Sequence, residues 1–90
     1  MDKSIRITVT GLVQGVGFRF FARRAAQTLG VSGWVRNRPD GSLEVLAEGD
    51  EEAPHALVRK LREGPLGAKV VGVTVEDAMV QGFARFEVRM

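Results

Sequence analysis

The residues best suited to chemistry lie in one short segment, Gly11 to Arg19, which has the sequence GLVQGVGFR. The segment joins an alternating apolar stretch to residues with helical spacing, so free backbone N–H groups and the positive end of a helix face whatever occupies it. Its glycines let the amides converge with no Cβ in the way of an anion. Arg19 adds a full positive charge, which is unfavourable at a helix start unless an anion accompanies it. The segment therefore has anion-binding geometry, with space for a bound phosphate.

Two better-known phosphate motifs do not fit this segment. The nucleotide P-loop requires a Lys followed by a Ser or Thr, and none of these residues occurs between Gly11 and Arg19. Gly15 and Gly17 begin the glycine pattern of dinucleotide-binding folds, but Phe20 stands where the third glycine belongs. The segment therefore predicts neither a magnesium nucleotide nor a dinucleotide.

The elements around the segment follow from its flanking patterns. Apolar residues alternate from Ile5 to about Thr10, which predicts a half-buried first strand. Apolar residues then recur at helical spacing from Phe18 to Leu29, and Gly30 provides a C-terminal stop. The anion-binding segment is therefore expected to connect a strand to a helix.

A hairpin is expected next. Residues 31–38 read as a second strand and residues 43–47 alternate as a third, with a Pro-Asp-Gly turn at residues 39–41 between them. Asp50 is the predicted N-cap of a second helix, with two glutamates after it to favour its positive end. Gly64 and the proline after it are expected to end that helix.

The remaining pattern completes a known arrangement. Alternating valines over residues 71–75 predict a fourth strand, and apolar residues over 83–88 predict a short closing strand. The order β-α-β-β-α-β with an extra terminal strand predicts an α+β, ferredoxin-like sandwich: an antiparallel sheet with both helices on one face. We expect residues 1–90 to form a single domain, because a chain of this length buries roughly 60–65% of its unfolded surface, enough for one core.

Composition excludes several kinds of function. The chain has no Cys and a single His, His55, which removes thiol nucleophiles, disulfides and His-based metal cages, so no metal is expected. No apolar run approaches the ~20 residues that cross a bilayer, and the start of the chain leads into a strand instead of a signal peptide. We therefore expect a cytoplasmic protein with no membrane partner. The net charge of +2 is too small to argue for nucleic acid.

The segment from Gly11 to Arg19 resembles the acylphosphatase signature, G-x-V-Q-G-V-x-[FY]-R, at every specified position. The second family segment, G-W-V-x-N-x-x-x-G, is matched from Gly33 to Gly41. The resemblance covers essentially the whole chain and implies an enzyme that hydrolyses acyl phosphates to a carboxylate and inorganic phosphate. It further implies direct attack by water, with no cofactor, metal or covalent intermediate.

The resemblance also implies roles for individual residues. Arg19 corresponds to the arginine that binds phosphate in the ground and transition states, and Asn37 to the residue that orients the attacking water. From the residues alone, Asn37 could equally open the turn that follows it. Arg38 departs from the small hydroxyl residue that many relatives have after the asparagine, and it receives no role. The backbone amides expected to complete the phosphate cradle belong to Val13, Gln14, Gly15, Val16, Gly17 and Phe18.

The expected partners are therefore small molecules: an acyl phosphate substrate, and inorganic phosphate as product and competitive inhibitor of a monomer. An RNA-binding module of the same topology is the first alternative, because Gln81 to Phe86 superficially matches an aromatic RNA-binding strand motif. That motif belongs on the third strand, which has no aromatic residue here, so no nucleic-acid partner is expected. A second alternative is a regulatory or carbamoyl-phosphate-handling module within a larger assembly, against which the short chain argues.

Overall fold

Alternating apolar residues build the centre of the sheet in the computed structural model, which describes residues 1–90. β1 (Asp2–Leu12) buries Ile5, Ile7 and Val9 completely. β3 (Leu43–Asp50) pairs with it antiparallel along its whole length, so that Ile7 lies opposite Val45. Both strands are longer than predicted, because this pairing continues to Asp50 at one end and β1 runs past Thr10 at the other.

The five strands lie in the order β4-β1-β3-β2-β5. β2 (Ser32–Asn37) pairs antiparallel with β3, and β4 (Lys69–Ala78) pairs antiparallel with β1. β5 (Phe86–Val88) runs parallel to β2. The predicted ferredoxin-like arrangement is therefore confirmed, with one correction: the closing strand makes the sheet mixed, because a long connection returns the chain to the far edge.

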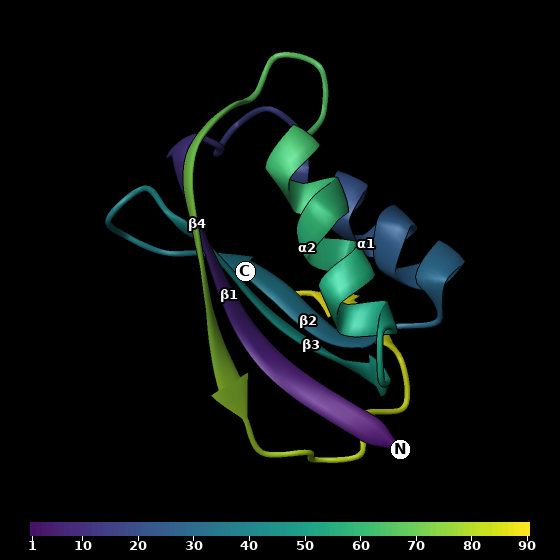
Figure 1. Cartoon of the computed structure of the whole chain (residues 1–90). Helices are drawn as coiled ribbons and strands as arrows, with labels where there is room; N and C mark the ends of the chain where they lie inside the picture. Colours follow the sequence, from purple (N-terminus) through teal and green to yellow (C-terminus); the bar gives the residue numbers. More distant parts are fainter.

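Both helices pack on one face of this sheet (Figure 1). α1 (Phe18–Leu29) has the predicted bounds, and Gly30 ends it at φ 72°, with its N–H bonded to helix carbonyls. α2 (Ala53–Glu63) buries Leu57, Val58 and Leu61 and ends before Gly64. No helix of the structure is both long and apolar enough to cross a membrane.

The predicted helix cap at Asp50 is wrong. Asp50 is the last residue of β3, where it pairs with Asp2, and its carboxylate accepts a hydrogen bond from the ammonium of Met1 at 3.2 Å. Pairing between β1 and β3 therefore places Asp50 in a strand, although the local sequence is typical of a helix N-cap. The N-cap position belongs to Glu52, which makes no side-chain capping bond.

Two strand predictions also need correction. The register between β1 and β4 shifts between Thr10 and Gly11, which leaves Val71 in a bulge and 75% exposed instead of on the apolar face. Gly11 sits at φ 124° against this bulge, and a Cβ there would lie 2.1 Å from the Lys69 carbonyl oxygen. The predicted closing strand begins later, at Phe86, because Phe83 belongs to the connection before it.

Candidate active site

The loop between β1 and α1 leaves backbone amides free at the helix start. Gly15 and Gly17 both have positive φ, 75° and 76°, a conformation that other residues rarely adopt. Gly17 is the N-cap and offers no side-chain bond, and the first turn of α1 holds no acidic residue. Phe21 is the residue whose N–H closes the first turn, onto the Gly17 carbonyl at 3.0 Å. The amides just before it therefore point out of the helix end, where an anion can accept them.

These amides border a hollow of about 130 Å³ that brings both motif segments together. Its size is well below the roughly 300–1,000 Å³ of sites for drug-sized ligands, so it suits a small group such as a phosphoryl. The predicted residues Arg19 and Asn37 both line it, although they are far apart in sequence. Its full lining is Val13, Gly15, Gly17, Phe18, Arg19, Phe20 and Asn37.

Arg19 reaches from the start of α1 to the C-terminal segment. Its Nη1 donates a hydrogen bond to the carbonyl oxygen of Arg89 at 3.2 Å and lies 3.9 Å from the sulfur of Met90. A guanidinium has five N–H donors, so this contact leaves most of them for a ligand. Sequence reasoning missed Arg89, because a backbone carbonyl at the other end of the chain leaves no local signal.

Asn37 lies at the end of β2 and presents an unsatisfied polar group. Its Oδ1 is buried and has no hydrogen-bond partner in the protein. Buried acceptors are nearly always paired, and the unpaired Oδ1 means that no internal bond fixes this oxygen, although Asn37 lines the hollow. A turn-forming Asn would bond its own backbone, and Oδ1 of Asn37 makes no such bond.

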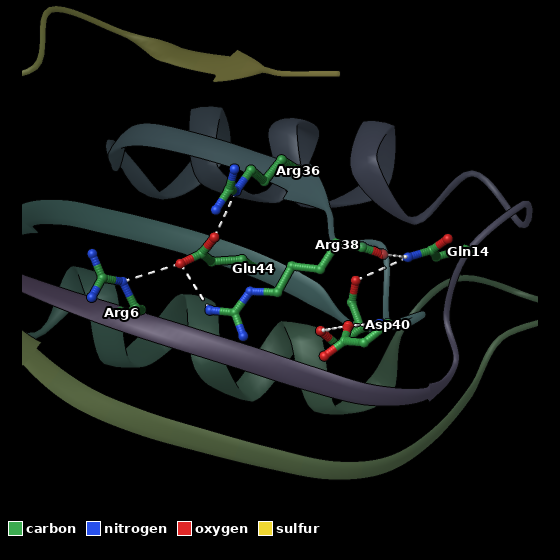
Figure 2. Close-up of polar contacts among 7 residues, drawn as sticks. Arg6, Gln14, Arg36, Arg38, Asp40 and Glu44 are labelled. Atoms are coloured by element: carbon green, nitrogen blue, oxygen red, sulfur yellow. Dashed lines mark hydrogen bonds and ion pairs between the residues drawn. The ribbon is translucent and has the colours of Figure 1, made fainter.

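The side chain of Gln14 holds the loop against the β2–β3 hairpin. Its Nε2 donates to the carbonyl oxygens of Arg38 at 2.7 Å and Ser42 at 3.0 Å, which ties the loop to the β2–β3 hairpin (Figure 2). Neither Gln14 nor Val16 lines the hollow, and Val16 packs against the core. Four of the predicted cradle residues, Val13, Gly15, Gly17 and Phe18, do line it.

The hairpin turn is fixed by its own hydrogen bonds. Oδ1 of Asp40 accepts from the hydroxyl of Ser42 at 2.6 Å and from its N–H at 2.9 Å. These two bonds, the hydroxyl first, hold the pKa of the Asp40 carboxyl below its ordinary value. Gly41 completes the turn at φ 95°. The carbonyl groups that Gln14 binds therefore belong to a rigid turn.

Glu44 of β3 gathers three arginines on the sheet face away from the helices (Figure 2). Its Oε1 accepts from Nε of Arg36 at 2.6 Å, and its Oε2 lies 2.8 Å from Nη2 of Arg38 and 3.2 Å from Nε of Arg6. The Arg38 bond holds the pKa of Glu44 below its ordinary value although burial opposes it, and the same bond raises the pKa of Arg38. Arg38, which received no role from the sequence, thus has a defined partner.

Sequence reasoning missed Glu44, although a signal existed. Arg36 and Glu44 lie directly opposite each other across the predicted hairpin, and opposite charges in that position stabilise a strand pair. His55 lies on α2, away from the hollow. No group of three or more His, Cys, Asp or Glu side chains is arranged to hold a metal ion.

Comparison with known proteins identifies the family. The family model described as Acylphosphatase matches residues 5–88. An acylphosphatase of Thermotoga petrophila is 45% identical over 87 residues, which is 97% of this chain and 97% of that protein. The crystal structure of acylphosphatase from Bacillus subtilis superimposes with a TM-score of 0.95 at 40% identity and covers both chains fully.

A larger protein also contains this fold. The crystal structure of full-length HypF in its phosphate- and nucleotide-bound form matches the whole chain with a TM-score of 0.90 at 27% identity. This chain covers 12% of that protein. The fold therefore occurs both at this length and within a much longer chain.

Proposed function

The chain belongs to the acylphosphatase family and hydrolyses acyl phosphates to a carboxylate and inorganic phosphate, and we propose that it does so by direct attack of water on phosphorus in the hollow. Arg19 and the amides of the β1–α1 loop bind the phosphoryl oxygens. Asn37 holds the attacking water. One observation carries this proposal: Arg19, Asn37 and the open helix amides border the same 130 Å³ hollow.

The chemistry needs positioning and charge stabilisation more than a strong base. The carboxylate of an acyl phosphate is already a good leaving group, so the transition state is loose and spreads charge over the phosphoryl oxygens. Arg19 and the preorganised amides stabilise that charge. The arrangement therefore supplies what the reaction requires from groups already placed around the hollow.

The proposed reaction consumes only water and the acyl phosphate. The oxygen of water forms a bond to phosphorus, the bond from phosphorus to the acyl oxygen breaks, and the electron pair leaves with the carboxylate. Asn37 cannot take a proton at neutral pH, so a phosphoryl oxygen accepts the proton of the water. The Asn37 amide acts by fixing the water in line, a contribution of orientation.

Inorganic phosphate is proposed as both product and competitive inhibitor, because it presents the same oxygens to the loop as the substrate. Residues 1–90 are proposed to act as one domain. A single cluster of 16 buried residues, drawn from the sheet and both helices, supports this. Neither proposal requires a metal ion.

Hydrolysis of acetyl phosphate in water labelled with heavy oxygen tests the proposed step. The label should appear in inorganic phosphate, phosphate should inhibit competitively, and activity should persist in the presence of a chelator. Label in the acetate would mean attack on carbon and would overturn the mechanism. Binding of labelled single-stranded RNA, measured in parallel, should be undetectable if the RNA-binding alternative is wrong.

A further inference from the structure

Asn37 must be positioned from a distance, because no protein group bonds to its Oδ1. Its place in the hollow therefore depends on the backbone at the end of β2. The last paired residues of this hairpin are Asn37 and Leu43, so the sheet ladder itself stops at Asn37. An Asn at the end of a ladder is less constrained than one inside it, and a misplacement of about 1 Å costs up to about 10²-fold in rate.

The two neighbours of Asn37 are held by one carboxylate. Side chains alternate along a strand, so Arg36 and Arg38 point to the opposite sheet face from Asn37. Both guanidinium groups bind Glu44, at 2.6 Å and 2.8 Å, and Figure 2 shows Glu44 between them. Arg38 lies one residue beyond the last paired residue, Asn37. Its bond to Glu44 therefore restrains the chain just after the end of the ladder.

The same short stretch is also held from the loop. The carbonyl oxygen of Arg38 accepts from Gln14 at 2.7 Å, while its N–H donates to the carbonyl oxygen of Ser42 at 2.9 Å. Arg38 is thus fixed through its side chain by Glu44 and through its backbone by the loop and the turn. The loop keeps a second bond, from Gln14 to the carbonyl oxygen of Ser42 at 3.0 Å, so movement of Arg38 would act first on the Asn37 backbone.

Glu44 is 5% exposed, and burying a carboxylate costs several kcal/mol unless cations and hydrogen bonds compensate it. Arg6 shares its Oε2 at 3.2 Å, so three cations surround one anion. The pairing of Arg36 with Glu44 alone would neutralise the charge. The additional contact of Glu44 with Arg38, on the other side of Asn37, supports a positioning role.

We propose that Glu44 is a positioning residue for the reaction, which fixes the Asn37 amide in the hollow through Arg36 and Arg38. This inference rests on the proposed water-orienting role of Asn37. Loss of the carboxylate frees both arginines, widens the range of Asn37 orientations and lowers kcat. It leaves the loop amides and Arg19 untouched, so phosphate binds as before.

The matched control is Glu48, a second glutamate on the same strand and sheet face, 1% exposed. Its carboxylate binds backbone amides of the β4–β5 connection and none of the site residues. Glu44→Gln should lower kcat about 10-fold or more, with the phosphate inhibition constant within about 3-fold of wild type. Glu48→Gln should keep kcat within about 2-fold, whatever it does to thermal stability.

The decisive measurement combines Glu44→Gln with Asn37→Ala. If Glu44 acts through Asn37, the substitution at Glu44 should cause no further loss of kcat once the amide is gone. An equal loss in both backgrounds, or wild-type kcat in Glu44→Gln alone, would overturn the positioning role. Wild-type kcat in Asn37→Ala alone would instead overturn the proposed function of Asn37, so the two failures are distinguishable. If Glu44→Gln does not fold, Arg38→Ala, whose side chain is 29% exposed, takes its place in the same cycle with the same expected outcomes.

Discussion

Two glutamates of β3, Glu44 and Glu48, share a strand, a sheet face and nearly complete burial, yet they serve different ends of the molecule. Glu44 binds three arginine side chains beside the hollow. Glu48 binds three successive backbone amides, those of residues 81–83, at 2.7 Å, 2.7 Å and 3.2 Å. The role of a buried carboxylate therefore depends on which part of the chain its partners belong to.

The two sets of partners have different consequences. Two of the arginines around Glu44, Arg36 and Arg38, flank Asn37, and Gln14 binds the carbonyl oxygen of Arg38, so disturbance there reaches the site. The amides around Glu48 belong to a connection that leads to β5, and β5 is held independently by pairing with β2 and by the buried ring of Phe86. Variants near Glu44 should therefore change kinetics, and variants near Glu48 should change stability.

The largest kinetic effect at the site end is expected from Arg19→Lys. A point ammonium cannot reproduce the planar, two-pronged contact of a guanidinium with phosphate, so activity should fall on the order of 10²–10³-fold and most phosphate affinity should be lost. Arg23→Lys is the matched control, because Arg23 is exposed on the same helix outside the hollow. Near-normal turnover of Arg19→Lys in steady-state assays would contradict the assignment of Arg19.

A different kind of defect is expected for Asn37→Ala. Its kcat should fall by about 10²-fold, the loss typical of one preorganised polar contact, while competitive inhibition by phosphate stays within a few-fold of wild type. Circular dichroism melting checks that the variant folds. If phosphate binding is lost as severely as in Arg19→Lys, Asn37 is a direct phosphate ligand and the water-orienting role is wrong.

At the other end, Glu48→Gln should destabilise the protein without a kinetic defect. An amide in place of the carboxylate turns an N–H₂ donor toward backbone donors, and unsatisfied buried groups of this kind cost about 1–3 kcal/mol. Urea unfolding measures the loss. Hydrogen exchange should accelerate at the amides of Gln81, Gly82 and Phe83 before it does in β1, and unchanged exchange there would mean that Glu48 does not hold the connection.

Sequence patterns anticipated the parts of this molecule that depend on neighbouring residues. The bounds of α1, the glycines of the loop and the turn after Asn37 follow from spacing and turn chemistry, and the ferredoxin-like order follows from the elements. Two motif residues meet at the hollow because a strand-to-helix loop and a strand end lie at the same edge of the sheet.

The misses have a common physical origin in contacts between distant residues. Asp50 is an acceptable helix cap until β1 offers it a strand partner, and the alternation of the β4 valines cannot reveal a bulge set by Gly11. The partners of Glu48 lie 33 to 35 residues away in the chain. A glutamate in an alternating strand is predicted to be exposed to solvent. The burial of Glu44 and Glu48 depends on the assembled sheet and cannot be predicted from the strand alone.

The smallest expected effect is on the free energy of unfolding at acid pH, where substitutions of Glu44 and Glu48 should behave alike. Bonding to Arg38 lowers the pKa of Glu44 despite the opposing effect of burial, whereas burial of Glu48 raises its pKa but three backbone amides outweigh it. Both pKa values lie below the ordinary 4.5 of a free glutamate. A carboxyl with a depressed folded pKa contributes stability that is fully present above the unfolded pKa and is lost as the pH falls through the folded value.

The advantage of wild type over Glu48→Gln in free energy of unfolding should therefore be constant near neutrality and shrink as the pH falls below about 4.5. Glu44→Gln should converge with wild type in the same direction, since its arginine partners stay charged throughout. Urea titrations of the three proteins from neutral pH downward measure this. A difference that grows in acid would mean that these carboxyls are protonated more readily in the folded protein than in the unfolded chain, which would contradict the ion pairs and amide bonds on which the comparison of the two sites depends.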